Sequence, residues 1–254
     1  MTEGMLMDEK TGKVAVVTGS TKGIGRAIAL ALLERGFTVI ANYGHDDAAA
    51  ARLEEEAKRS PDGRLRLVRM DLSTPDSADA FAEAVLELEP AVDVVVLNAG
   101  ITIRKGFTEM THEEYRRIMD TNLNVPYFIL QRLHDHMRRD GRVILVGGGV
   151  GIYPHATVTP YGLSKAGMNY LAGALVKEFK DVGVTVNTIA PGFTETDWQS
   201  GKTPEVRKRI NGKIAAGRFA EPEEIAGMAM AIVDNGYVNG SVLKVDGGYG
   251  LERG

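Results

Sequence analysis

The stretch Val14-Ala15-Val16-Val17-Thr18-Gly19-Ser20-Thr21-Lys22-Gly23-Ile24-Gly25 decides the predicted fold. It begins with a short apolar run of the kind found in strands that are covered on both faces. A glycine-rich turn follows, and a helical pattern over Ile24–Glu34 begins at once. In such a turn, backbone amides can approach a pyrophosphate closely, and the helix N-terminus adds partial positive charge. The stretch therefore predicts a dinucleotide-binding turn at the start of an α/β domain.

The same alternation of apolar runs and helical patterns continues along the chain. The expected strands are Val14–Thr18, Thr38–Asn42, Arg66–Asp71, Val92–Asn98, Arg142–Val146, Val184–Ala190 and Ser241–Val245. The expected helices include Ile24–Glu34, Ala48–Lys58, Ser77–Leu88 and Pro160–Lys180. Parallel strands joined by helices imply right-handed crossovers and a doubly wound sheet. We expect one Rossmann-type domain over residues 1–254, with residues 1–12 as a flexible N-terminal extension.

Composition narrows the functional classes. The net charge is −4 without any block of like charges, which argues against nucleic-acid binding. We interpret Arg138-Arg139 as the end of a helix, where cations complement the helix dipole. Residues 1–13 are polar and acidic, so they do not resemble a signal peptide, and no apolar run is long enough to span a bilayer. We expect a soluble cytoplasmic protein with no membrane partner.

The side chains that bind metals offer no site. The chain has no cysteine, which excludes a disulfide scaffold, a thiolate metal site and a cysteine nucleophile. His134 and His136 are two apart in an expected helix and so point to nearly opposite faces. No other group of His, Asp or Glu has the spacing of metal ligands. We expect no metal.

Several motifs, in order, resemble the short-chain dehydrogenase/reductase family over residues 12–250. They are Thr18-Gly19-x-x-x-Gly23-Ile24-Gly25, Asp71-Leu72, Asn98-Ala99-Gly100, Tyr161-x-x-x-Lys165, Pro191-Gly192 with Thr194 and Thr196, and Val245-Asp246-Gly247-Gly248. The resemblance implies that the chain is an oxidoreductase with a nicotinamide dinucleotide cofactor. The cofactor residues that it implies are Gly19, Ser20, Thr21, Lys22, Gly23, Ile24, Gly25, Asn42, Tyr43, Asp71, Leu72, Asn98, Ala99, Gly100, Tyr161, Lys165, Pro191, Gly192, Thr194 and Thr196.

Two residues favour NADP(H) over NAD(H). Enzymes that prefer NAD place an acidic side chain after the second strand to bind the ribose 2′-hydroxyl. Asn42 occupies that position here and carries no charge to repel a 2′-phosphate. Lys22 lies where the NADP-preferring relatives carry a cation, although it could also be a solvated lysine on an exposed turn. Asp46 and Asp47 lie too far along the chain for the acidic role.

Tyr161 and Lys165 are four residues apart in an expected helix and share one face. A tyrosine normally titrates near pH ~10, and a neighbouring ammonium would lower its pKa. By resemblance, Tyr161 exchanges a proton with the substrate oxygen, and Lys165 lowers its pKa and holds the nicotinamide ribose. Asn122 matches the asparagine that supports a water-linked proton path, with a helix-interior polar contact as its alternative.

One family residue is missing. Relatives carry a serine thirteen residues before the tyrosine, where its hydroxyl donates to the substrate carbonyl. In this chain that position is Gly148, with glycine on both sides. A hydroxyl of Tyr153, Thr157 or Thr159 could replace the serine, a group of the substrate or a water could do so, or the enzyme could be slow or inactive.

The resemblance extends most to 3-oxoacyl-acyl carrier protein reductases, through Ile40–Tyr43, Ala190–Phe193 and Gly217–Phe219. It implies reduction of a ketone to a secondary alcohol, with a small molecule or an acyl thioester as substrate and a homotetramer as the assembly. A reductase or dehydrogenase of a sugar, polyol or other small alcohol is one alternative. A weakly active sensor or scaffold is another. Trp198 forms a lid over substrate or packs beneath its loop.

Overall fold

The computed structural model describes residues 12–251, so the extension predicted for residues 1–12 lies outside the described residues except for Gly12. A seven-stranded parallel sheet forms the centre, in the order β3-β2-β1-β4-β5-β6-β7. Its strands are β1 (Val14–Val17), β2 (Thr38–Tyr43), β3 (Arg64–Arg69), β4 (Val92–Leu97), β5 (Met137–Val146), β6 (Thr185–Pro191) and β7 (Val242–Val245). The predicted doubly wound Rossmann-type sheet is confirmed.

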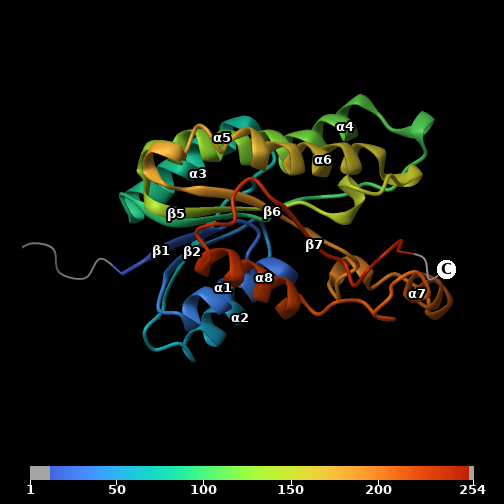
Figure 1. Cartoon of the computed structure of the whole chain (residues 1–254), viewed down its shortest axis with the longest axis horizontal. Coiled ribbons are helices and arrows are strands. Elements are labelled where there is room, and N and C mark those ends of the chain that lie inside the picture. The colour runs from blue at the N-terminus through green and yellow to red at the C-terminus, as the bar shows by residue number, and fades with distance from the viewer. Residues whose placement is uncertain (1–11, 252–254) are drawn as a thin grey trace, which may run out of the picture.

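Helices cover both faces of this sheet (Figure 1). They are α1 (Gly23–Glu34), α2 (Asp47–Ala57), α3 (Pro75–Leu88), α4 (His112–Met119), α5 (Val125–Leu133), α6 (Thr159–Ala174), α7 (Pro204–Asn211) and α8 (Pro222–Asp234). Figure 1 shows α3, α4, α5 and α6 on one side of the sheet and α1, α2 and α8 on the other. No helix within residues 12–251 is long and apolar enough to cross a membrane.

The central strands are apolar on both sides because each side faces a helical layer. Two clusters of buried side chains result. One includes Phe81 of α3 and Ile129 of α5, and the other includes Ile28 of α1 and Ile225 of α8. Each of these four side chains is no more than 1% exposed. Burial of one such side chain is worth about 1.5–3 kcal/mol, so the two clusters fix the helices to the sheet.

Several predicted boundaries shift by one or two residues, and two are wrong by more than that. Strand β5 begins at Met137, so Arg138-Arg139 lie in a strand and not at a helix end. Arg138 is held there by Asp93 of the neighbouring strand, whose carboxylate lies 2.7 Å from its guanidinium. Helix α6 ends at Ala174 and does not reach Lys180, because the chain then turns to bury Phe179 before β6.

The strand order reverses between β1 and β4, which lie side by side while the chain leaves them in opposite directions. In open parallel sheets, ligands bind in the crevice outside the carboxyl ends of the strands at such a point. The residues that follow β1, β2, β4, β5 and β6 all come to this edge. Most of the site residues implied by the sequence motifs lie here.

Candidate active site

The turn between β1 and α1 leaves no room for a side chain at Gly19 or Gly25. Gly19 has a left-handed backbone with φ 61°, and a Cβ there would lie 3.0 Å from the Cα of Ala99. A Cβ on Gly25 would collide with the carbonyl oxygen of Gly19 and lie 2.5 Å from Nδ2 of Asn98. Since a glycine lets another group approach its backbone closely, this turn is built for such an approach.

The residues after β4 fix that turn in place. The Asn98 amide nitrogen Nδ2 donates to the carbonyl oxygens of Thr18 at 3.0 Å and Gly19 at 2.9 Å. In return, the Thr18 hydroxyl accepts from the backbone amides of Asn98 and Ala99 at 2.9 and 3.0 Å. The β1 turn and the Asn98-Ala99-Gly100 segment therefore form one rigid floor.

Helix α1 begins in a way that fits the phosphates of a dinucleotide. Its N-cap residue, Lys22, makes no side-chain cap, and its first turn holds no acidic residue. Ser20, which precedes it, is tied to β2 through its backbone amide and its hydroxyl, both of which donate to the Asn42 carbonyl at 2.9 Å. The amides at this helix N-terminus are thus free of a side-chain acceptor, and the local field attracts an anion.

In this structure without a ligand, the side chains of Asn42 and Lys22 are both held by other groups of the protein. Asn42 is 2% exposed, and its side chain bonds backbone groups only, accepting from Gly19 and donating to Val68 and Met70. Lys22 forms an ion pair with Asp46 and lies 3.6 Å from Asp197. The sequence argument set Asp46 aside as too far along the chain for the acidic role and did not foresee this ion pair; Asp46 also caps α2 by accepting from the backbone amide of Ala49.

Other predicted cofactor residues lie along the same edge. The Tyr43 hydroxyl donates to Asp47 at 3.0 Å, and the half-exposed Asp71 carboxylate lies 3.4 Å from His45. Leu72 is 5% exposed and belongs to the core.

The loop after β6 folds back over the phosphate turn. A Cβ on Gly192 would lie 2.7 Å from the Cα of Asp246, which fixes the loop against the end of β7. The Thr194 hydroxyl donates to the Gly192 carbonyl at 3.3 Å. Thr196 reaches the turn itself, since a Cβ on Gly23 would lie 2.9 Å from its Cγ2. The structure thus brings the Pro191–Thr196 segment and the Gly19–Gly25 segment together.

Tyr161 and Lys165 lie on one face of α6, at the carboxyl end of β5. The Lys165 ammonium is buried and donates to the carbonyl oxygen of Val146 at 2.7 Å. It lies 5.8 Å from the centre of the Tyr161 ring. Within residues 12–251 the Tyr161 hydroxyl makes no hydrogen bond, so it is available to a ligand.

The expected lowering of the Tyr161 pKa by Lys165 is wrong for this structure. Burial raises the pKa of Tyr161, and only the Arg104 cation opposes that shift. The Trp198 ring packs against Tyr161 at 5.7 Å between ring centres, while the Lys165 ammonium points to Val146. Burial also lowers the pKa of Lys165 to about 8.

Asn122 is fully buried in the π-helical turn Asp120–Asn124. Its side chain accepts from the Ile101 amide at 2.8 Å and donates to the Ile101 carbonyl at 2.9 Å. It also donates to the Ser164 hydroxyl at 3.1 Å. The side-chain amide is therefore a bridge between the segment after β4 and helix α6, and all of its bonds are to protein.

Gly148 lies beside the tyrosine, where the family serine would stand. Its φ of 169° and ψ of 151° are those of extended backbone that any residue adopts. A Cβ there would lie 3.7 Å from the Tyr161 hydroxyl oxygen and 3.8 Å from Cγ of Lys165, which is ordinary contact. Gly147 differs, because its Cβ would lie 2.5 Å from Oδ1 of Asn169.

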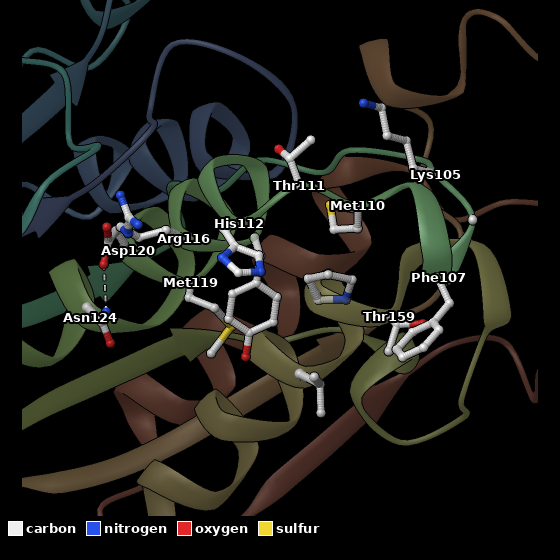
Figure 2. Close-up of a pocket in the computed structure, with 14 residues that line it drawn as sticks. Lys105, Phe107, Met110, Thr111, His112, Arg116, Met119, Asp120, Asn124 and Thr159 are labelled. Atoms are coloured by element: carbon white, nitrogen blue, oxygen red, sulfur yellow. Dashed lines mark hydrogen bonds between the residues drawn. The ribbon is translucent and has the colours of Figure 1, made fainter.

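The hydroxyls considered as replacements for the serine have other partners. Tyr153 accepts from Lys244 at 3.2 Å, and Thr157 lies 3.3 Å from Nδ1 of His155. Thr159 donates to the Ala156 carbonyl at 3.2 Å. Figure 2 shows Thr159 near Phe107 in the lining of a separate cavity of about 600 Å³. In this structure none of them contacts Tyr161.

A smaller cavity of about 330 Å³ lies between the segment after β4 and the loop after β6. Its lining includes Trp198, whose ring meets the Tyr161 ring edge to face at 5.7 Å. It also includes Arg104, which the sequence argument missed. Its position shortly after Asn98-Ala99-Gly100, at the carboxyl end of a central strand, was the available signal. Within residues 12–251, no cluster of three or more His, Asp or Glu side chains could hold a metal ion.

Comparison with known proteins agrees with this geometry. The short chain dehydrogenase family matches residues 13–207. A 3-oxoacyl-[acyl-carrier-protein] reductase of Vibrio harveyi is 36% identical over 241 residues, which are 93% of this chain and 97% of that protein. A 3beta-hydroxysteroid dehydrogenase of Eggerthella lenta is 34% identical over an alignment of 256 positions, which covers 98% of this chain and 98% of that protein. The solved structure of an angucycline C-6 ketoreductase with bound NADP superposes with a TM-score of 0.88 at 31% identity, covering 94% of this chain and 96% of that one.

This chain belongs to the short-chain dehydrogenase family and is an oxidoreductase. The resemblance predicted from the ordered motifs is confirmed, including its direction towards 3-oxoacyl-acyl carrier protein reductases.

Proposed function

We propose that this protein uses NADPH to reduce a ketone to a secondary alcohol. The observation that carries the proposal is the position of Tyr161, whose unpaired hydroxyl lies next to Lys165 at the edge where the phosphate turn and the loop after β6 meet. When bound, the reduced nicotinamide supplies a hydride to the carbonyl carbon. The proton that completes the alcohol comes from the Tyr161 hydroxyl to the carbonyl oxygen.

Each neighbouring residue supports that proton transfer. The Lys165 ammonium, held by the Val146 carbonyl, keeps a positive charge near the phenol below pH about 8. Once the proton has moved to the substrate, that charge would stabilise the phenolate, although in this structure without a ligand it does not offset the rise that burial causes in the pKa of Tyr161. The Trp198 ring packs edge to face against the ring of Tyr161 and shields that side of it. Asn122 acts as a positioning residue, because its side chain joins Ile101 to helix α6.

NADP(H) is the cofactor that we propose. The turn from Gly19 to Gly25 and the uncapped start of α1 would hold the phosphates, and Thr194 and Thr196 would close over them. Two of the solved structures most similar to this chain contain NADP or NADPH. The absence of an acidic side chain at Asn42 supports the same choice, and Lys22 would bind the 2′-phosphate after leaving Asp46.

For the substrate, the similar reductase of Vibrio harveyi supports a 3-oxoacyl thioester or a related ketone. A sugar, polyol or other small alcohol is the alternative substrate class. Gly148 favours a third candidate, a weakly active sensor or scaffold, because the structure offers no hydroxyl in place of the family serine.

We also propose a homotetramer. The α4 and α6 surfaces expose large side chains, with Tyr170 78%, Leu163 50% and Tyr115 43% accessible. Further copies of this chain would cover them, and light scattering of the purified protein measures the mass of the assembly.

The test is NADPH oxidation against a panel of ketones and thioesters, with Tyr161→Phe beside the native protein. Since the variant keeps the ring and loses only the proton donor, turnover should disappear while NADPH binding stays nearly the same. Retention of most of the rate by Tyr161→Phe would show that Tyr161 is structural and that the mechanism is wrong.

A further inference from the structure

The cavity of about 330 Å³ beside helix α6 contains groups that the proposed reduction does not use. It lies between the segment after β4 and the loop after β6, and its lining is Gly100, Ile101, Thr102, Arg104, Trp198 and Gln199. Through Trp198 it adjoins Tyr161, since the two rings meet edge to face at 5.7 Å. A molecule whose carbonyl lies at Tyr161 would therefore extend towards this cavity.

Arg104 in the cavity lining and Lys202 near it have no carboxylate partner among residues 12–251. Arg104 is exposed and forms neither a hydrogen bond nor an ion pair there. Lys202 reaches only the Trp198 carbonyl, at 3.5 Å, and the face of the Phe193 ring, at 6.0 Å.

The neighbouring carboxylates of the loop after β6 already have cationic partners. Glu195 is paired with Arg207, and Asp197 lies 3.6 Å from Lys22. The positive charge at the cavity is therefore not balanced by the protein.

Polar atoms of the cavity lining are also left without partners. The Thr102 hydroxyl and the Gln199 side-chain oxygen are buried and make no hydrogen bond. A buried polar group without a partner costs stability, so each one calls for an explanation. The hydroxyl can donate, and rotation of the Gln199 amide would present its NH₂ group. Rotation of both side chains towards the cavity would set these groups beside the Arg104 guanidinium, where together they match the acceptors of a carboxylate.

The charges also act on one another and on the proton donor. The Arg104 cation opposes the rise that burial causes in the pKa of Tyr161. Burial lowers the pKa of Lys202, and repulsion from the Arg104 and Arg207 cations lowers it further. An anion in the cavity would relieve that repulsion.

We propose that this cavity binds the carboxylate of a small oxo-acid substrate and that Arg104 is the residue that selects it. The proposal rests on the proposed ketone reduction and names its substrate class. A phosphate of an acyl carrier offers similar chemistry. The volume of the cavity is small, and Trp198 in its lining contacts Tyr161. An anion only a few bonds from the carbonyl fits these two observations, which favours a short oxo acid.

The first test is binding and does not depend on turnover. Trp198 is the only tryptophan of the chain, so its fluorescence reports directly on this cavity. Acetoacetate and its neutral isostere acetoacetamide would be titrated in the presence of NADP⁺. We expect acetoacetate to bind at least about tenfold more tightly, as a charge-assisted contact implies. Arg104→Gln should remove the difference.

Lys105→Gln is the matched control. It removes the neighbouring cation, which lies 2.5 Å from Glu114 and lines the other, larger cavity. The preference for acetoacetate should survive in this variant. Equal binding of the two ligands to the native protein, no saturable change with either, or a preference that persists in Arg104→Gln would overturn the proposal.

The second test is NADPH oxidation with the same pair of ligands and with acetoacetyl-CoA. Faster turnover of acetoacetate, lost in Arg104→Gln, supports the proposal. Equal turnover of acid and amide would leave the ketone reduction intact and refute the anion site. Tighter binding of acetoacetate without turnover of any ketone would support the anion site and refute the ketone reduction. If Arg104→Gln slowed the turnover of acetoacetyl-CoA alone, Arg104 would bind a phosphate of the carrier. That result would also refute a short oxo acid as the substrate.

Discussion

The substitution Gly148→Ser restores to this site the hydroxyl that its relatives carry. The backbone at this position is extended, with φ 169°, so a side chain introduces no strain. A Cβ would lie 3.7 Å from both the Tyr161 hydroxyl oxygen and Cγ1 of Val150, without displacing either. The serine hydroxyl, one bond further out, would then stand beside the proton donor and face the carbonyl.

The expected gain follows from the strength of such a donor. One preorganised donor to a developing oxyanion contributes about 2.7–4 kcal/mol in an evolved site. A grafted hydroxyl lacks neighbours that fix its rotamer, so we expect less. A gain of about tenfold in kcat/KM, which corresponds to about 1.4 kcal/mol, is the predicted result.

The assay compares kcat/KM for NADPH-dependent reduction of one ketone by the native protein, Gly148→Ser and Gly148→Ala. The alanine variant adds the same Cβ without the hydroxyl and so isolates the donor. Loss of glycine entropy from the unfolded chain should raise the stability of both variants, by about 0.4–1 kcal/mol. A folded serine variant no faster than the alanine variant would refute the reasoning. An inactive native protein that gains turnover only with serine would favour the sensor.

Three further predictions concern the cofactor turn and the buried lysine. Gly25→Ala should lower the melting temperature and weaken NADPH binding by more than about tenfold, because its Cβ collides with backbone. Gly227→Ala has open space around its Cβ, so it should leave the melting temperature unchanged or raise it. In titrations with both cofactors, Lys22→Ala should narrow an NADPH preference of several fold, and Asp46→Asn, which keeps a good N-cap, should widen it. Because burial lowers the pKa of Lys165 from 10.5 to about 8, the unfolded chain binds more protons between those pH values. The free energy of unfolding should therefore rise across that window, by on the order of 3 kcal/mol, and Lys165→Met should lack the rise.

Each of these predictions has an outcome that contradicts it. Equal melting temperatures for Gly25→Ala and Gly227→Ala would mean that the turn tolerates a side chain. Equal affinities for NADPH and NADH in the native protein would remove the cofactor argument. Parallel stability curves for the native protein and Lys165→Met from pH 8 to 10 would show that the ammonium is not desolvated.

The sequence predicted the features that depend on local pattern. The strands could be found because their residues are apolar on both faces, and the Tyr161–Lys165 pair because a helix places residues four apart on one face. The start of β5 could not be found, since its polar first half is held by the contact of Arg138 with Asp93 from another strand. Local pattern also could not show that Tyr161 would pack against Trp198, because that contact depends on how distant segments pack.

Lys22 illustrates the same limit. Its place in the turn indicated a phosphate ligand, yet the structure pairs it with Asp46, which the fold brings close from the start of α2. Spacing along the chain made Asp46 appear too distant to matter at this turn. Because β1 and β2 are neighbours in the sheet, the residues that follow the two strands lie close together, and Lys22 contacts Asp46 directly.

Asn98 and Asn122 bridge segments that are far apart in the sequence. Asn98 joins β4 to the β1 turn, and Asn122 joins the residues after β4 to α6. The phosphate turn, the segment after β4 and helix α6 are thus held in place relative to one another without a ligand. Little conformational entropy of these segments would therefore be lost on binding. Substitutions that change substrate preference would disturb this arrangement least in the cavity lining, at Arg104 and Trp198. A change at either asparagine would disturb two of these segments at once.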